Sequence, residues 1–170
     1  MDVNQSQIHG SIKYTVIGRY VAEFRDFTGM VDYDPKLREV KSVNLTIKTM
    51  SLKSKHPTLD KIVLSKRLLN VKKYPEISFQ SKRIKKNKDG YYVRGDVNLH
   101  GVSEAIGFPF TVEGPLPSKN HKKVLRAHGR WILNRKDFKV IWNILLDQGG
   151  VIVGDHIMVD WQIVAVKSNT

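Results

Sequence analysis

The chain has 170 residues and no cysteine, which suits one domain with its own core and excludes both a disulfide framework and a thiolate metal site. Its formal net charge of +13 lies within one segment, because residues 36–88 hold 16 Lys and Arg against only the three acids Glu39, Asp60 and Glu76. Such an excess points to an anionic partner, either phospholipid headgroups or nucleic acid, unless it only solvates the protein surface.

The first residues of the chain, 1–7, are polar and lack the apolar stretch of a signal peptide, so we expect a flexible N-terminus. Residues 8–167 show no internal repeat and no low-complexity linker, which predicts a single domain. No apolar run approaches the length that spans a bilayer as a helix.

Much of the chain alternates apolar and polar residues with a period of two, which is typical of strands with one buried face. The apolar positions of this alternation are Val43, Leu45, Ile47, Ile77, Phe79, Val93, Val97, Leu99, Ile106, Phe108, Phe110, Val112, Ile157, Val159, Trp161 and Ile163. The sequence Asn87-Lys88-Asp89-Gly90 lies between two such runs and predicts a hairpin turn, because Asp-Gly tolerates positive φ.

Residues 57–66 are the exception to this alternation. Leu59, Ile62 and Val63 have helical spacing after Pro57, which predicts one short helix. About eight strands with a single helical insertion predict an all-β fold, an eight-stranded antiparallel, lipocalin-like barrel. The interior of such a barrel either is filled by side chains or holds one slender ligand, and the pattern alone favours the filled core.

Motifs for catalysis are absent from the sequence. It has no Gly-x-Ser-x-Gly nucleophile elbow, no phosphate-binding loop and no dinucleotide-binding glycine pattern. The six histidines do not have the spacing of zinc ligands. We therefore expect no catalytic residue, no bound metal and no cofactor, and treat enzyme activity as the least favoured function.

Three short motifs follow one another in a fixed order. They are Tyr74-Pro75-Glu76-Ile77-Ser78-Phe79, Asn98-Leu99-His100-Gly101-Val102-Ser103 and Leu133-Asn134-Arg135-Lys136-Asp137-Phe138. Together they resemble the YceI-like family of polyisoprenoid-binding, lipocalin-like barrels. The resemblance implies a barrel that holds a long-chain amphiphile, such as a polyisoprenoid or an isoprenoid quinone, in an apolar tunnel for carriage or storage. It also implies a periplasmic or secreted protein, and it leaves a homodimer open.

The resemblance implies that inward apolar residues of the barrel line a tunnel. We predict this lining to be Phe79, Val97, Phe108, Phe110, Trp131, Val159 and Trp161. The side chains that we expect to contact a headgroup or an anionic membrane surface are Lys82, Arg83, Lys85, Lys86 and Arg135. Each lining residue has an alternative place in a plain core, and Arg135 has an alternative role in an ion pair or backbone cap.

A nucleic-acid-binding barrel is the main alternative function. The run of basic residues from Lys82 to Lys88 could follow a phosphate backbone, with Tyr91 and Tyr92 as stacking platforms. Few aromatic residues interleave with these bases, however, and lysines at a hairpin tip also protect strand ends from pairing. Nucleic acid is therefore the less favoured partner.

Overall fold

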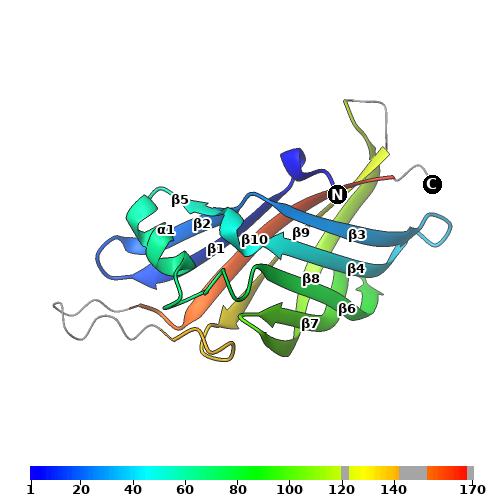
Figure 1. The fold of residues 1–170 in the computed structure, drawn as a ribbon. Coiled ribbons are helices and arrows are strands. Elements are labelled where there is room, and N and C mark those ends of the chain that lie inside the picture. The colour runs from blue at the N-terminus through cyan, green and yellow to red at the C-terminus, as the bar shows by residue number, and fades with distance from the viewer. Residues whose placement is uncertain (120–122, 142–152, 168–170) are drawn as a thin grey trace.

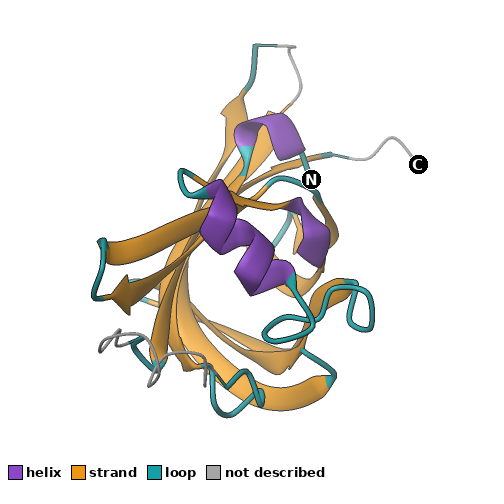
Figure 2. Cartoon of the chain, turned by 60° about the vertical axis from the view of Figure 1, so that its left-hand side comes forward, coloured by secondary structure: helices purple, strands orange, loops and turns teal. Residues whose placement is uncertain are grey.

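The computed structural model describes residues 1–119, 123–141 and 153–167. Within these residues ten antiparallel strands form one strongly curled sheet, in the order β3-β4-β6-β7-β8-β9-β10-β1-β2-β5 (Figure 1). The strands are β1 (Gln7–Tyr14), β2 (Gly18–Phe24), β3 (Phe27–Asp34), β4 (Glu39–Lys48), β5 (Leu52–Ser54), β6 (Glu76–Asn87), β7 (Gly90–Leu99), β8 (Val102–Pro117), β9 (Lys123–Asn134) and β10 (His156–Val166). Figure 2 shows the α-helix α1 (Pro57–Leu64) across the open side of the curled sheet.

The predicted all-β, antiparallel, lipocalin-like architecture with one short helix is confirmed, but the sheet has ten strands where about eight were expected. Part of the difference has a simple physical reason. The strand β5 has only three residues, too few for a period of two to be recognised, and it is held by a three-residue ladder with β2. The strands β3 and β5 are the two ends of the strand order.

Two local predictions agree with the structure. The helix expected over residues 57–66 is α1, which begins at Pro57, where the missing N–H of proline leaves no hydrogen bond unmade. It ends before Ser65, whose extended backbone donates its N–H to the carbonyl of Ile62. The predicted turn joins β6 to β7, with Asn87 paired to Gly90 and a φ of +140° at the glycine.

The N-terminal residues lie between the two sides of the sheet. Residues Val3–Gln5 form the 3₁₀ helix η1, and the N–H of Asp2 donates to the carbonyl of Val164 on β10 at 2.8 Å. The terminal ammonium of Met1 donates to the carbonyl of Gly29 on β3 at 3.4 Å. These bonds connect β10 to β3 through the N-terminus. The flexibility expected for residues 1–7 remains a prediction.

The two ends of the barrel are closed differently. Near the β3–β4 and β6–β7 turns, the buried side chains of Val40, Tyr91 and Phe110 belong to one packed cluster. At the opposite end, α1 and the segment 65–75 cross the sheet and bury Leu68 and Val71. The interior between these ends contains the candidate site.

Candidate functional site

The concave face of the sheet encloses an apolar cavity of about 240 Å³. Since a water-sized group needs about 10–15 Å³ of such volume, the cavity has room for on the order of 20 groups of that size. The wall combines inward residues of the sheet with residues of α1 and of the segment 65–75.

All seven residues predicted to line a tunnel lie on the wall of this cavity. They come from five neighbouring strands, β6 to β10, and are Phe79, Val97, Phe108, Phe110, Trp131, Val159 and Trp161. Alternation brings them together, because residues two apart on a strand face the same side of the sheet. Their place on the wall is observed, and their contact with a ligand remains a prediction.

Aromatic rings gather on one part of the wall. The rings of Phe108 and Trp131 are stacked, with centroids 4.9 Å apart and planes 9° apart, and Phe110 lies 6.1 Å from Trp161. The indole Nε1 atoms of Trp131 and Trp161 are buried and have no hydrogen-bond partner among the described residues. A buried donor without an acceptor costs about 1–3 kcal/mol, and both nitrogens lie beneath the surface of the cavity.

Several wall residues were missed by the sequence analysis. Leu59 and Val63 of α1, with Leu68 and Leu69, close the cavity at one end. The helical spacing of the first pair was visible in the sequence, but nothing local showed that the helix would lie over the barrel interior. On β1, the inward face includes Gly10, where an added Cβ would meet the Ile157 methyl at an ordinary 3.7 Å.

A buried carboxylate fixes α1 to the sheet. Asp60 of α1 is 5% exposed and accepts hydrogen bonds from the Tyr20 hydroxyl at 2.7 Å, from the Ser54 N–H at 2.9 Å and from the Ser54 hydroxyl. Burial acts to raise the pKa of Asp60, but these hydrogen bonds outweigh it and hold the pKa below its usual value. Burial, and then the bond to Asp60, raise the pKa of Tyr20 above its usual value.

Arg135 lies at the end of β9, buried in the cavity wall. Its Nε donates to the Gly154 carbonyl at 2.9 Å, one Nη to the Val140 carbonyl at 2.8 Å and the other to Asp155 at 3.0 Å. The guanidinium therefore ties β9 to the chain that leads into β10. These bonds match the predicted structural role, and contact with a headgroup remains a prediction.

The three sequence motifs meet at the same end of the barrel. The ring of Tyr74, from the first motif, lies 4.6 Å from the His100 ring of the second. His100 Nδ1 lies 3.2 Å from the Phe138 carbonyl of the third motif. Gly101 has a φ of +73°, and an added Cβ there would lie 2.5 Å from the Tyr74 ring. The motifs therefore build one shared corner.

The other four residues predicted to contact a headgroup lie elsewhere. Lys82, Arg83, Lys85 and Lys86 are exposed on β6, and none of them belongs to the cavity wall. Lys82 pairs with Asp96 at 3.4 Å, and the ammonium of Lys86 donates to the Arg38 carbonyl at 3.1 Å. Their contact with a membrane or a headgroup remains a prediction.

The structure corrects one detail of the nucleic-acid alternative. Tyr91, expected as a stacking platform, is 6% exposed, and its hydroxyl donates to the Arg38 carbonyl at 3.1 Å. It faces inward because it shares the buried side of β7 with Val93 and Val97. Tyr92, at 39% exposed, is the one member of the pair that reaches solvent.

Within residues 1–119, 123–141 and 153–167, no three His, Asp or Glu side chains lie close enough together to hold a metal ion. In the same ranges no helix has the length and apolar character needed to cross a membrane.

A curled antiparallel sheet around an apolar cavity defines the class of lipocalin-like barrels. The model of the YceI-like domain matches residues 1–165, and the chain therefore belongs to the YceI-like family. UPF0312 proteins of Yersinia pestis and Yersinia enterocolitica are 33% identical to it over 131 residues, which cover 76% of this chain and 67% of each relative. The resemblance seen in the three motifs is confirmed.

Solved structures share the fold. Burkholderia cenocepacia BcnA aligns with a TM-score of 0.81 at 23% identity, over 96% of this chain and 98% of that protein. Campylobacter jejuni YceI aligns with a TM-score of 0.74 at 24% identity, over 87% of this chain and 85% of its own. A polyisoprenoid binding domain from Saccharophagus degradans aligns with a TM-score of 0.71 at 12% identity, over 96% and 94% of the two chains.

Proposed function

We propose that the protein binds a long-chain isoprenoid lipid in the cavity and carries or stores it without catalysis. The observation that carries this proposal is the apolar cavity of about 240 Å³ along the barrel interior. Apolar walls of this kind bind ligands chiefly by removing apolar surface from water. The polyisoprenoid binding domain from Saccharophagus degradans, which has the same fold, supports an isoprenoid as the class of ligand.

The energetics suit reversible carriage. Burying a tail gains about 0.8 kcal/mol for each CH₂-sized unit, so roughly 20 units offer on the order of 15 kcal/mol relative to water. A tail taken from a bilayer is already out of water and forfeits most of this gain, and ordering the tail offsets more of it. Exchange between membrane and protein is therefore close to balanced.

Within this class we favour an amphiphile with a hydrogen-bond acceptor, such as an isoprenoid quinone. The indole N–H groups of Trp131 and Trp161 have no acceptor but lie beneath the cavity surface, so a ligand acceptor would reach them only if the rings turned; the stacked ring of Phe108 supports a flat ring on the ligand.

The non-catalytic role is supported by the chemistry of the wall. Its one charged group among the described residues, apart from His9, is Arg135, whose three nitrogens all donate hydrogen bonds to protein acceptors. No nucleophile with an adjacent base is recognisable in the sequence. A periplasmic or secreted location and a homodimer remain predictions that follow from the resemblance alone.

Titration of tryptophan fluorescence tests the proposal, because Trp131 and Trp161 lie on the cavity wall. We expect polyprenols and isoprenoid quinones of increasing length to give a saturable change whose affinity rises with length and then levels off as the cavity fills. A short isoprenol of one unit should give no saturable change. The proposal fails if no long-chain isoprenoid produces saturable binding to the folded protein.

A further inference from the structure

The segment that closes the α1 end of the cavity has two contrasting kinds of side chain. Apolar side chains line the cavity, namely Leu52, Leu59, Val63, Leu68 and Leu69. The same stretch of chain carries seven basic residues that are exposed to solvent, Lys53, Lys55, Lys61, Lys66, Arg67, Lys72 and Lys73. We call these seven residues the basic cap. This short segment therefore combines a part of the cavity wall with a strong positive charge.

The chain segment of the basic cap contains little acidic charge of its own, although Glu23 of β2 lies opposite Lys53 in the β2–β5 ladder. Within residues 53–73 the one acid is Asp60, which is buried and already accepts hydrogen bonds from Tyr20 and Ser54. None of the seven basic side chains forms an ion pair with another described residue, although Lys73 lies 5.2 Å from the centre of the Tyr74 ring. Elsewhere on the sheet, exposed lysines such as Lys48 and Lys82 have acidic partners.

We propose that the basic cap docks the α1 end of the barrel onto an anionic phospholipid bilayer. Each Lys or Arg near such a surface adds to the attraction, and seven cations without ion pairs at one end of the barrel give a large sum. Docking in this orientation places the part of the cavity wall made by α1 and the segment 65–75 against the lipid. Exchange of lipid through this end is a further step of the proposal. Only that step rests on the proposed function.

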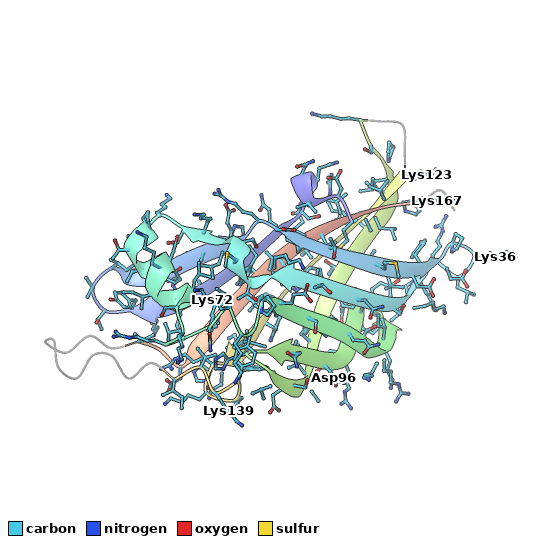
Figure 3. The ribbon with its side chains drawn as sticks, in the orientation of Figure 1. Lys36, Lys72, Asp96, Lys123, Lys139 and Lys167 are labelled. Atoms are coloured by element: carbon cyan, nitrogen blue, oxygen red, sulfur yellow. The ribbon has the colours of Figure 1, made fainter. Side chains whose placement is uncertain are left out.

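The basic strand β6 does not offer an equivalent docking face. Its turn to β7 lies beside the β3–β4 turn, as the bond from Lys86 to the Arg38 carbonyl shows. Behind this end, Val40 and Tyr91 are buried in a packed cluster and neither lines the cavity. Figure 3 places Lys72 toward the α1 side of the molecule and Lys36 at the far end. A bilayer at the β6–β7 turn would face Val40 and Tyr91, which do not line the cavity, although Val93, Phe108 and Phe110 of the same cluster do.

Two triple variants with equal charge change test the proposal. The first neutralises the basic cap with Lys66→Gln, Arg67→Gln and Lys72→Gln, and the second neutralises β6 and its turn with Arg83→Gln, Lys85→Gln and Lys88→Gln. All six side chains are exposed, and thermal unfolding checks that both variants fold. Binding is measured by sedimentation with vesicles of phosphatidylcholine alone, and with vesicles containing roughly one-third phosphatidylglycerol.

We expect the cap variant to bind the anionic vesicles roughly 100-fold more weakly, since each charge near the surface contributes about fivefold. The β6 variant should lose less than about fivefold, as expected for charges that lie away from the surface. Equal losses in both variants, or a larger loss in the β6 variant, would overturn the proposal. So would tight single-stranded DNA binding that competes with the vesicles.

Lipid uptake measured on the same proteins separates this inference from the proposed function. Vesicle docking through the cap without uptake of any long-chain lipid would support the docking face and refute the lipid-binding role. If the protein takes up lipid but its vesicle binding does not depend on the cap charges, the lipid-binding role is supported and the docking face is refuted.

Discussion

The carboxylate of Asp60 on α1 and the hydroxyl of Tyr20 on β2 lie 2.7 Å apart, although 40 residues separate them in the chain. Both side chains are buried, and the N–H and hydroxyl of Ser54 complete the set of donors to Asp60. This one carboxylate therefore fastens α1 over the cavity that its neighbours Leu59 and Val63 help to line.

Replacing this carboxylate should destabilise the fold. We expect Asp60→Ala to lower the free energy of unfolding by about 2–3 kcal/mol, because the buried Tyr20 hydroxyl and the Ser54 N–H lose their acceptor. Denaturant unfolding measures the change. Asp137→Ala, at an exposed position in the corner after β9, is the matched control and should stay within about 0.5 kcal/mol of wild type. Equal effects of the two changes would show that the bonds to Asp60 add little.

The same group predicts an acid-dependent loss of stability. Because the pKa of Asp60 is lower in the folded protein than in the unfolded chain, the unfolded state binds the proton first as pH falls. The stability difference between wild type and Asp60→Ala should be full at neutral pH and should shrink below about pH 4, through the folded-state pKa. Unfolding curves over this range measure it, and a difference that grew on acidification would have the wrong sign.

Arg135 should matter for stability more than its neighbour Lys136, although both contact Asp155. Arg135→Met leaves the buried Val140 carbonyl and the Gly154 carbonyl without their donors, and we expect a loss of roughly 3 kcal/mol. Lys136→Met breaks an exposed pair and should cost less than about 1 kcal/mol. Denaturant unfolding measures the loss of stability in both variants. Similar small losses would show that the hydrogen bonds of Arg135 do not stabilise the fold.

Filling the cavity should block lipid uptake without unfolding the protein. Gly10→Leu adds a side chain on the inward face of β1, where the first added atom has room. A Leu side chain takes the space of about four methylene-sized groups, so binding of a full-length isoprenoid should weaken by roughly 100-fold. Val21→Leu, on an exposed face of β2, is the control and should leave uptake unchanged. Unaltered uptake by a folded Gly10→Leu protein would place the ligand elsewhere.

The indole N–H of Trp131 allows a test of ligand chemistry. Trp131→Phe keeps a ring to stack on Phe108 and removes the unpartnered donor. Affinity for an isoprenoid quinone should fall by about five- to tenfold, the value of one hydrogen bond, while a pure hydrocarbon such as squalene should bind as before. Competition binding with both ligands measures this ratio. Equal losses for the two ligands would mean that the N–H meets no ligand acceptor.

The sheet and the part of the cavity wall on β6 to β10 were predictable because alternation is a local signal. Val97, Phe108 and Val159 face inward for the same reason that their neighbours face out, and the sequence shows this directly. Alternation did not distinguish a filled core from a cavity. Inward apolar residues are needed in both cases, and the free volume depends on how all the strands curl around one another.

What the sequence analysis missed depends on contacts between distant segments. Asp60 is one acid in a basic stretch, and its burial becomes apparent only when Tyr20 is found beside it. Tyr91 was expected at the surface because lysines precede it, although its position on β7 places it inside. In the sequence, the basic residues near α1 and those on β6 belong to one basic segment, residues 36–88. Only the fold shows that the two groups lie at different places on the molecule.

The most direct test of the lipid-binding account is native mass spectrometry of the protein as purified, followed by organic extraction of whatever it holds. The account predicts a near-stoichiometric adduct that the extract identifies as a long-chain isoprenoid or isoprenoid quinone, and loss of that adduct in Gly10→Leu. A clean mass of the chain alone, with no uptake when such lipids are offered, would contradict it.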